Sequence, residues 1–306
     1  MSDQLISILI ANYNNERYIV DSIQSVINQS YANWEIIIYD DGSDNQNWIN
    51  KITANYSGIN LRCYSSKKNN GCGYAKKKLI ELANGDFFIF LDPDDALHKD
   101  CLFLLYNDII KDNQLSISYA THFICDEFLS EQKVSDYPSR ISKGQSMFHV
   151  NTGNISAPAL VRKKMYLLTP GLNENLKRAV DNDLYAKMEE VGFVHFVEIP
   201  LYFYRQHTTN ISTGKNELDA LKQRLVVIND LYKRRESNSN EYTSNITKGE
   251  KLELEFLFFQ YCLYQTSIYT ISFWIAFFKL LLIVFLQGKS ILTFLKIIKI
   301  KVSVKK

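Results

Sequence analysis

The sequence predicts an α/β protein whose core is a parallel, doubly wound sheet, and three observations support this prediction. Residues 1–97 alternate short apolar runs with segments of helical spacing. The connections between these segments are short, which is typical of β-α-β units. Clusters of acidic and polar residues follow several of the apolar runs, at the sheet edge where ligands bind in folds of this kind.

The first four strands are expected from apolar runs that are nearly continuous, a pattern typical of strands buried on both faces. These runs cover residues 6–11, 34–39, 61–65 and 87–91. Three helices are expected to connect them, over residues 16–29, 44–56 and 74–83. Apolar residues recur at helical spacing in the first of these helices, and Asp44 can act as the N-cap of the second.

The pattern beyond residue 97 is less regular but still predicts both helices and strands. Helices are expected over residues 99–111 and 183–191, strands over 116–125, 157–162 and 193–199, and an amphipathic helix over 218–231. A stretch rich in Ser, Asn and Thr, with almost no apolar residue, follows this helix. We therefore expect one domain over residues 1–235, a linker over 236–250 and a separate segment over 251–306.

The net charge of +2 conceals two parts of opposite sign. Residues 256–306 carry seven lysines and no acidic residue, whereas residues 1–255 carry 28 basic and 33 acidic residues. The near-neutral total argues against a nucleic-acid-binding protein, and a hydrophobic content of 46% excludes a disordered chain. Five cysteines without CxxC spacing favour reduced thiols in a cytosolic protein.

Three carboxylates, Asp92, Asp94 and Asp95, follow the fourth apolar run. A divalent cation would relieve their mutual repulsion. Mg²⁺ or Mn²⁺ held by one or two carboxylates keeps coordination positions open for phosphate oxygens. The same Asp-Pro-Asp-Asp segment could instead be a turn that caps the next helix, so the spacing by itself leaves both interpretations open.

A second acidic pair, Asp40 and Asp41, ends the second apolar run and precedes Gly42. A carboxylate at this position could accept a hydrogen bond from a nucleobase or a ribose hydroxyl. A strand-to-helix turn with a positive φ at Gly42 is the simpler alternative. Further along the chain, the loop NGCG precedes Lys76, which is compatible with phosphate binding and equally with a solvated helix face.

Two later positions combine charge with a predicted element boundary. Asp181 precedes a predicted helix, where it could cap the helix or act as a general base for a hydroxyl group. Arg205 and His207 follow an apolar strand and could contact an anionic group. A lone histidine is more often structural than catalytic. For Asp181, Arg205 and His207, the sequence alone therefore leaves both a structural and a functional role open.

Taken together, these segments resemble the family 2 glycosyltransferases, which have the GT-A fold. The similarity extends over about residues 5–212. Five segments carry it, in the order that the family shows: ISILIANYNNERYIVDSIQSVINQSYANWEIIIYDDGSDN, NNGCGYAKKK, ANGDFFIFLDPDD, VDNDLYAKMEEVGF and IPLYFYRQHTTNIS. The resemblance implies a GT-A, Rossmann-like, mostly parallel sheet flanked by helices, with residues 1–97 binding a nucleotide sugar and residues 98–235 facing the acceptor.

The resemblance also implies a nucleotide-sugar donor, most often a UDP-sugar, and a divalent metal such as Mn²⁺ or Mg²⁺. Ala11 and Tyr13 would line the base pocket, and Asp41 would contact the uracil or the ribose. Asp94 and Asp95 would lie at the metal and the diphosphate, with Asp92 nearby.

On the acceptor side, the resemblance makes Asp181 the catalytic base. Arg205 and His207 would lie in a loop over the donor diphosphate or the acceptor. Direct displacement by the activated hydroxyl would invert the anomeric centre and convert an α-linked donor into a β-linkage.

Two residues depart from the family's pattern. Lys76 stands where the family usually has arginine, and a lysine binds phosphate without the bidentate geometry of a guanidinium. Val180 stands where many members have glutamate, directly before the proposed base. These departures put the diphosphate contact and the acceptor-side hydrogen bonds in question.

The apolar and basic segment at the C-terminal end of the sequence predicts contact with a membrane. Between residues 256 and 286 the only charged residue is Lys279. A helix of this length could span a bilayer or lie in its plane, with aromatic residues at the interface. The lysines beyond it suit an anionic cytoplasmic leaflet. A helical hairpin packed on the domain, or in an oligomer interface, is the alternative.

Two functions remain as hypotheses from the sequence. The first is an inverting, metal-dependent glycosyltransferase that extends a lipid-linked or surface glycan at the cytoplasmic face of the inner membrane. The second is a catalytically silent nucleotide-sugar-binding or scaffold subunit of a membrane glycan-assembly complex. A nucleotidyltransferase is disfavoured, because it would carry a Gly-rich basic loop where this chain has NYNNE after its first strand.

Overall fold

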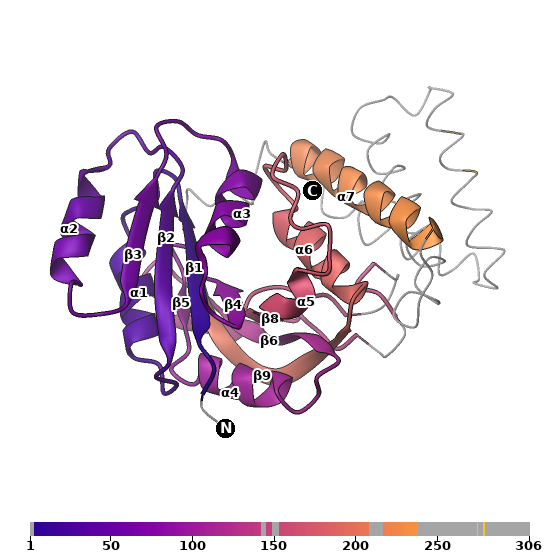
Figure 1. The fold of residues 1–306 in the computed structure, drawn as a ribbon, viewed down its shortest axis with the longest axis horizontal. Helices are drawn as coiled ribbons and strands as arrows, with labels where there is room; N and C mark the ends of the chain where they lie inside the picture. The colour runs from indigo at the N-terminus through magenta and orange to yellow at the C-terminus, as the bar shows by residue number, and fades with distance from the viewer. Residues whose placement is uncertain are drawn as a thin grey trace.

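The computed structural model describes residues 3–141, 145–148, 153–207, 217–237, 274 and 278. Within these residues, nine strands form one sheet in the order β3-β2-β1-β4-β8-β6-β9-β5, with β7 paired to β6 (Figure 1). Strands from residues 1–97 and from residues 98–235 therefore belong to the same sheet, since β4 pairs with β8.

The first part of the sheet is parallel, as the apolar runs predict. Its strands are β1 (Ile6–Asn12), β2 (Trp34–Asp40), β3 (Leu61–Ser65) and β4 (Phe87–Phe90). They are connected by α1 (Ile19–Ile27), α2 (Asn47–Asn55) and α3 (Cys72–Leu82). The carboxyl ends of β1, β2 and β4 consequently meet at one edge, where the acidic clusters of the sequence lie.

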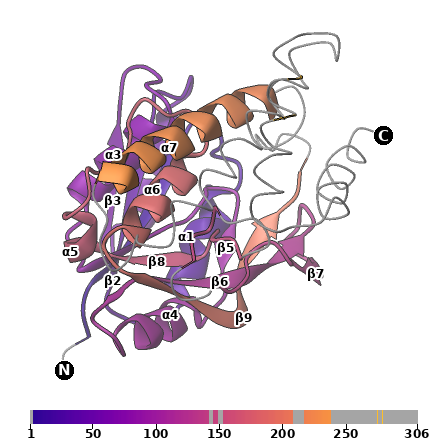
Figure 2. The same cartoon turned by 90° about the vertical axis from the view of Figure 1, so that its right-hand side faces the viewer.

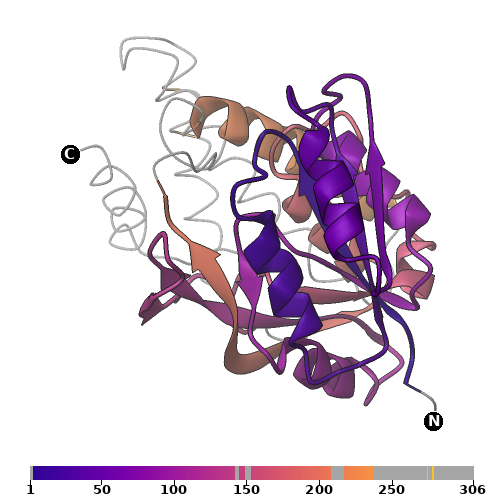
Figure 3. The ribbon, with the colours of Figure 1, turned by 90° about the vertical axis from the view of Figure 1, so that its left-hand side faces the viewer.

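Alternating side chains of these strands enter two separate cores, because successive residues of a strand point to opposite faces. Ile6, Ile8 and Ile10 pack with α1, α2 and α4 (Cys101–Ile109) on one face, where Figure 3 shows the indigo helix α1 in front of the sheet. Leu9 packs on the other face with α3, α6 (Val180–Glu189) and α7 (Glu217–Ser237). These three helices lie together in Figure 2.

The second part of the sheet is mixed, which corrects the expectation of a mostly parallel sheet. Its strands are β5 (Ala96–Leu97), β6 (Leu115–Cys125), β7 (Glu131–Val134), β8 (Ala159–Arg162) and β9 (Phe193–Arg205). Strand β8 runs antiparallel to both β4 and β6, and β5 runs antiparallel to β9. Only β6 and β9 pair in parallel in this part. The strand direction depends on the route of the chain between strands, which apolar patterning does not encode.

Several element boundaries differ from the predicted ones for local reasons. Helix α2 begins at Asn47, and the Asp44 carboxylate accepts a hydrogen bond from Asn14 Nδ2 (3.1 Å) and does not cap the helix. Strand β9 continues past Pro200, where its register with β6 shifts, as expected for proline at a bulge. The short elements β5, β7 and α5 (Lys163–Tyr166) were not expected.

The amphipathic helix predicted over residues 218–231 is confirmed as part of α7, which continues to Ser237. The first two residues of the predicted linker, 236 and 237, therefore belong to this helix, and the rest of the linker and the segment 251–306 lie outside the described residues. Among the described residues, no helix has the length and apolar character needed to cross a membrane. The four cysteines described are free thiols.

A buried ion pair joins α7 to α6. The guanidinium of Arg235 lies 3.4 Å from Glu189, and both side chains are almost fully buried. Burial raises the pKa of Glu189, although Arg235, Ser146 and the Met147 N–H oppose this rise. The adjacent Arg234 pairs with Glu190 at 2.8 Å in a more exposed position.

We expect Arg235→Met to destabilise the fold by about 3–5 kcal/mol at pH 7, because it leaves the Glu189 carboxylate buried without its cation. A buried acid with a raised pKa is stabilised by protonation, so this loss should shrink as the pH falls toward 5. Chemical denaturation at both pH values measures it. Arg234→Met is the matched control and should have a much smaller effect; equal effects of the two substitutions would contradict the prediction.

Candidate functional site

The carboxyl edge of the sheet brings together charged residues from four elements, β4, β9, α3 and α6. Asp92 and Asp94 follow β4, Arg205 ends β9 and His207 follows it. Lys76 extends from α3, and Asp181 lies in the first turn of α6. Helix α6 starts three residues earlier than predicted, so Asp181 belongs to the helix and does not precede it.

Arg205 is the buried centre of one half of this site, with 2% of its surface exposed. Its Nε donates to the Asp94 carbonyl oxygen (2.6 Å), and its guanidinium also contacts Asp21 (2.7 Å) and the Glu127 carbonyl oxygen. The guanidinium carbon lies 4.2 Å from the centre of the Tyr18 ring. Arg205 thus anchors the turn after β4 through the Asp94 carbonyl oxygen.

Asp94 and His207 form a pair next to Arg205. The Nε2 atom of His207 lies 2.8 Å from Asp94 Oδ2, and its ring packs against Tyr18 with the ring centres 5.3 Å apart. Asp94 is partly exposed, so its carboxylate is accessible to a ligand. Asp94 and His207 come from segments that are far apart in the sequence, but the structure brings their side chains together at the carboxyl edge of the sheet.

Asp95 points into the protein and is 2% exposed. Its Oδ2 accepts a hydrogen bond from the Tyr202 hydroxyl (2.7 Å), and its Oδ1 accepts one from the Arg205 N–H (2.8 Å). Burial and the neighbouring carboxylates Asp92 and Asp94 raise the pKa of Asp95 well above its usual value. Asp95 therefore connects the turn after β4 to β9. Sequence spacing did not distinguish this structural role from the metal binding that was predicted for Asp95.

The other half of the site is the ion pair of Lys76 and Asp181. Lys76 Nζ lies 2.6 Å from Asp181 Oδ1 and 4.7 Å from the centre of the Phe90 ring. Burial disfavours the lysine's charge, but Asp181 and Asp92 outweigh it, so the pKa of Lys76 is raised well above its usual value. About half of the Asp181 side chain remains exposed, and the carboxylate is oriented by the pair while staying accessible.

Asp92 links the two halves electrostatically. Burial in the surrounding protein, together with the charges of Asp181 and Asp94, raises the pKa of Asp92 to about 6, although Lys76 acts in the opposite direction. Its side chain still reaches solvent. A carboxyl group in this position would gain from a cationic partner supplied by a ligand.

The structure also shows the surroundings of the two residues that depart from the family's pattern. Lys76 extends to Asp181 and forms an ion pair with it. Val180 is buried in the core beside α6 and α7, where a glutamate would lose its hydration. Val180 therefore contributes to the packing of the protein core.

The predicted base-binding residues lie at the end of β1 and beside the loop that follows β3. Ala11 is partly buried and Tyr13 is 43% exposed. The Asp41 carboxylate accepts the backbone N–H groups of Asn70 (2.9 Å) and Gly71 (2.7 Å). Gly42 next to it has φ +78° and would place a Cβ within 2.4 Å of the Lys68 backbone. Asp41 therefore shapes the loop that begins α3, which carries Lys76.

The donor set at this edge fits a divalent cation of the Mg²⁺ or Mn²⁺ type. Such ions are held by one or two carboxylates together with substrate phosphates. Asp94 and Asp92 supply accessible carboxylates, whereas both oxygens of Asp95 already accept hydrogen bonds. No group of three or more metal-ligating side chains is present within the described part of the chain.

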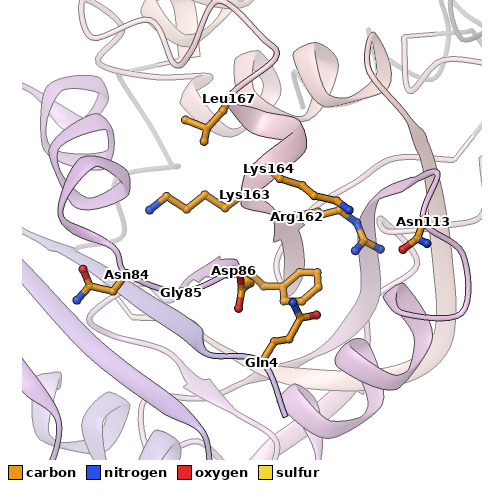
Figure 4. A pocket seen from close by; sticks show the side chains of 10 residues that line it. Gln4, Asn84, Gly85, Asp86, Asn113, Arg162, Lys163, Lys164 and Leu167 are labelled. Carbon is orange, nitrogen blue, oxygen red and sulfur yellow. The ribbon is translucent and has the colours of Figure 1, made fainter. Parts of the chain in front are cut away.

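A separate polar cavity of about 420 Å³ lies at the opposite edge of the sheet (Figure 4). It is lined by Gln4 and Asp86, which precede β1 and β4, and by Arg162 and Lys163 at the end of β8. Arg162 donates to the carbonyl oxygens of Leu115, Ile109 and Asp112, and Lys163 donates to that of Ala83. These two cations satisfy backbone carbonyls, and the cavity contains none of the predicted site residues.

Sequence patterns missed four residues that complete the site. Tyr18, Asp21 and Glu127 each contact Arg205, and Glu127 also accepts a hydrogen bond from the Tyr18 hydroxyl. The fourth is Tyr202, whose hydroxyl donates a hydrogen bond to Asp95. Tyr18 and Asp21 lie at the start of α1, where they resemble ordinary surface residues. Only their proximity to Arg205, more than 180 residues later in the sequence, gives them a role.

This sheet, with carboxylates and a candidate base at its carboxyl edge, defines an α/β protein of the GT-A-like class. A model of the family described as glycosyl transferase family 2 matches residues 7–167, more than half of the chain. The chain belongs to this family, as its sequence segments indicated.

Three relatives illustrate the similarity. The chain is 30% identical over 223 residues to a chondroitin synthase of Escherichia coli, covering 70% of this chain and 31% of the relative. It is 29% identical over 234 residues to a hyaluronan synthase of Pasteurella multocida, covering 74% and 23%. It is 30% identical over 244 residues to the amylovoran biosynthesis glycosyltransferase AmsB of Erwinia amylovora, covering 74% and 80%. The chain thus spans less than a third of the two synthases.

Solved structures share the fold at low sequence identity. Residues 1–349 of TarS from S. aureus match with a TM-score of 0.63 at 15% identity, over 85% of this chain and 72% of TarS. TarS in complex with UDP-GlcNAc matches with a TM-score of 0.62 at 16% identity, over 85% and 73%. A mannosyltransferase from Pyrobaculum calidifontis in complex with GDP-Man and Mn²⁺ matches with a TM-score of 0.53 at 9% identity, over 86% and 76%.

Proposed function

We propose that this protein transfers a sugar from a nucleotide sugar, specifically a UDP-sugar, to a hydroxyl group of a lipid-linked or surface glycan, with inversion at the anomeric carbon. One observation carries the proposal: an accessible carboxylate, Asp181, is oriented by Lys76 beside the carboxylates that follow β4. Related chains are named as polysaccharide synthases, and one structure with the same fold was determined with UDP-GlcNAc.

In the proposed reaction, the carboxylate of Asp181 accepts the proton of the acceptor hydroxyl as its oxygen attacks the anomeric carbon. Lys76 holds this carboxylate in one orientation, so little rearrangement is needed at the moment of attack. The leaving group is a nucleoside diphosphate, and Asp94 with Asp92 would hold the metal ion. That ion would neutralise the negative charge that develops on the diphosphate. Arg205 keeps the turn of Asp94 fixed through its contact with the carbonyl oxygen.

We also place the protein at the cytoplasmic face of the inner membrane. The sequence of residues 256–306, apolar and basic with no acid, supports this placement. A lipid-linked acceptor lies on the same surface, so attachment would raise its concentration near the site.

Incubating the full-length protein with a panel of UDP-, GDP- and dTDP-sugars, Mn²⁺ and lipid-linked glycan acceptors tests the proposal. We expect one UDP-sugar to release its nucleoside diphosphate with acceptor present, and a chelator to suppress the release. Binding of a nucleotide sugar without turnover on any acceptor would favour the silent scaffold subunit. Neither binding nor release across the panel would contradict both functions.

A further inference from the structure

A single side chain of α7 reaches the loop that leads into α6, the helix of Asp181. The Oε1 atom of Gln223 accepts hydrogen bonds from the backbone N–H groups of Lys177 (2.6 Å) and Arg178 (2.7 Å). One carbonyl oxygen has two lone pairs, so it can satisfy both neighbouring donors at once. The contact joins segments 45 and 46 residues apart in the sequence.

The two residues held by Gln223 determine how α6 begins. Ala179 follows them with φ 55° in the left-handed region, and α6 then starts at Val180. Within the part of the chain that the structure describes, no side chain makes an N-cap hydrogen bond to α6. The direction of the first turn, which contains Asp181, is therefore set by the backbone that enters it.

Further contacts hold the earlier part of the same loop. The N–H of Gly73 in α3 donates to the Leu176 carbonyl oxygen (2.8 Å), and Asp183 accepts the N–H of Asn173 (2.9 Å). Residues 177 and 178 lie between these contacts and Asp181. Gln223 thus acts on the last segment before the base.

The helix that carries Gln223 is anchored on the protein core. Val227, Ile228 and Leu231 of α7 are buried in the core that also contains residues of α6. Arg235, three turns further along α7, forms the buried ion pair with Glu189 of α6. The two helices lie side by side in Figures 1 and 2. A side chain anchored on such a helix can transmit a defined geometry to the loop.

We propose that Gln223 is a positioning residue for the reaction: by holding the backbone of Lys177 and Arg178, it sets the orientation in which Lys76 pairs with Asp181. This inference rests on the proposed role of Asp181 as the base. A displacement of about 1 Å at a reacting group can lower a rate about 100-fold. Loss of the Gln223 acceptor should therefore act on the rate of transfer and leave donor binding almost unchanged.

Three variants of the full-length protein test this role. Gln223→Leu removes the acceptor, Gln223→Glu keeps an oxygen that can accept both N–H groups, and Asp230→Leu places the same side chain at an exposed position of α7. We expect Gln223→Leu to lower kcat about 10- to 100-fold with little change in the donor KM. Gln223→Glu should restore most of the rate, and Asp230→Leu should match the wild type.

A double variant separates positioning from general stability. If Gln223 acts through Asp181, adding Gln223→Leu to Asp181→Asn should lower the residual rate no further, because the two residues act as one unit. Hydrogen exchange should show faster exchange at the amides of residues 177 and 178 in Gln223→Leu, with α6 still protected.

Wild-type kcat in Gln223→Leu, full additivity in the double variant, or no rescue by Gln223→Glu would each overturn the inference. If instead the wild type transfers no sugar, or Asp181→Asn keeps full activity, the proposed function fails. The exchange measurement then still decides on the contact: equal protection of residues 177 and 178 in wild type and Gln223→Leu would refute it.

Discussion

Replacing Asp181 with asparagine should lower the rate of sugar transfer about 100- to 10,000-fold, the range that a positioned general base contributes. Asparagine has nearly the same size, and its carbonyl oxygen can still accept the hydrogen bond of Lys76. It cannot take the proton of the acceptor hydroxyl. Donor affinity should change little, because the substitution removes an interaction made only in the transition state. Steady-state kinetics should therefore show a lower kcat and a nearly unchanged KM for the donor.

Glu174→Gln is the matched control for Asp181→Asn. Glu174 also pairs with a lysine of α3, Lys77, at 2.7 Å, but it lies on the exposed side of the loop. The control removes a carboxylate charge from a similar lysine pair without changing the site. Comparable rate losses in the two variants would show that charge near α3 matters in general, and would contradict a specific role for Asp181.

Replacing Asp94 with asparagine should lower transfer about 100- to 1,000-fold, because a bound metal ion supplies several kcal/mol of charge stabilisation. The amide retains one oxygen but loses the negative charge that a hard cation requires. The activity of Asp94→Asn should need a higher Mn²⁺ concentration than that of the wild type. A titration of activity against Mn²⁺ measures the shift.

Asp95→Asn, one residue away, should act differently. Asp95 is buried and accepts hydrogen bonds from Tyr202 and Arg205, so this substitution should lower the melting temperature and leave the Mn²⁺ requirement unchanged. If Asp95→Asn shifts the Mn²⁺ titration and Asp94→Asn does not, the assignment of the two carboxylates is reversed.

Much of the catalytic edge could be predicted from local patterns. Strands buried on both faces leave continuous apolar runs, and β1, β2, β3 and β4 follow these runs to within about one residue. Parallel strands with short connections bring their carboxyl ends together, which is why Asp41, Asp92 and Asp94 lie on the same edge. Asp181 was identified by resemblance, since its spacing also suits a helix cap.

Adjacent acids at this edge could not be told apart in the same way. Asp94 and Asp95 have identical chemistry, but Asp94 is partly exposed and Asp95 is buried. Their difference depends on Tyr202 and Arg205, about 110 residues later, whose own sequence context carries no corresponding signal. The orientation of Lys76 toward Asp181 likewise depends on a contact across 105 residues.

Apolar periodicity and element-ending residues were thus sufficient to establish the α/β class, most strands and helices, and the edge at which the chemistry lies. These features follow from interactions between near neighbours, so a single stretch of sequence records them. The direction of β8, the inward side chain of Asp95, the pairing of Lys76 with Asp181 and the contact of Gln223 with the loop before α6 emerged only when distant segments packed together. Such contacts depend on the free energy of the whole fold, in which partners far apart in the chain compete for the same polar groups, and no local pattern encodes their outcome.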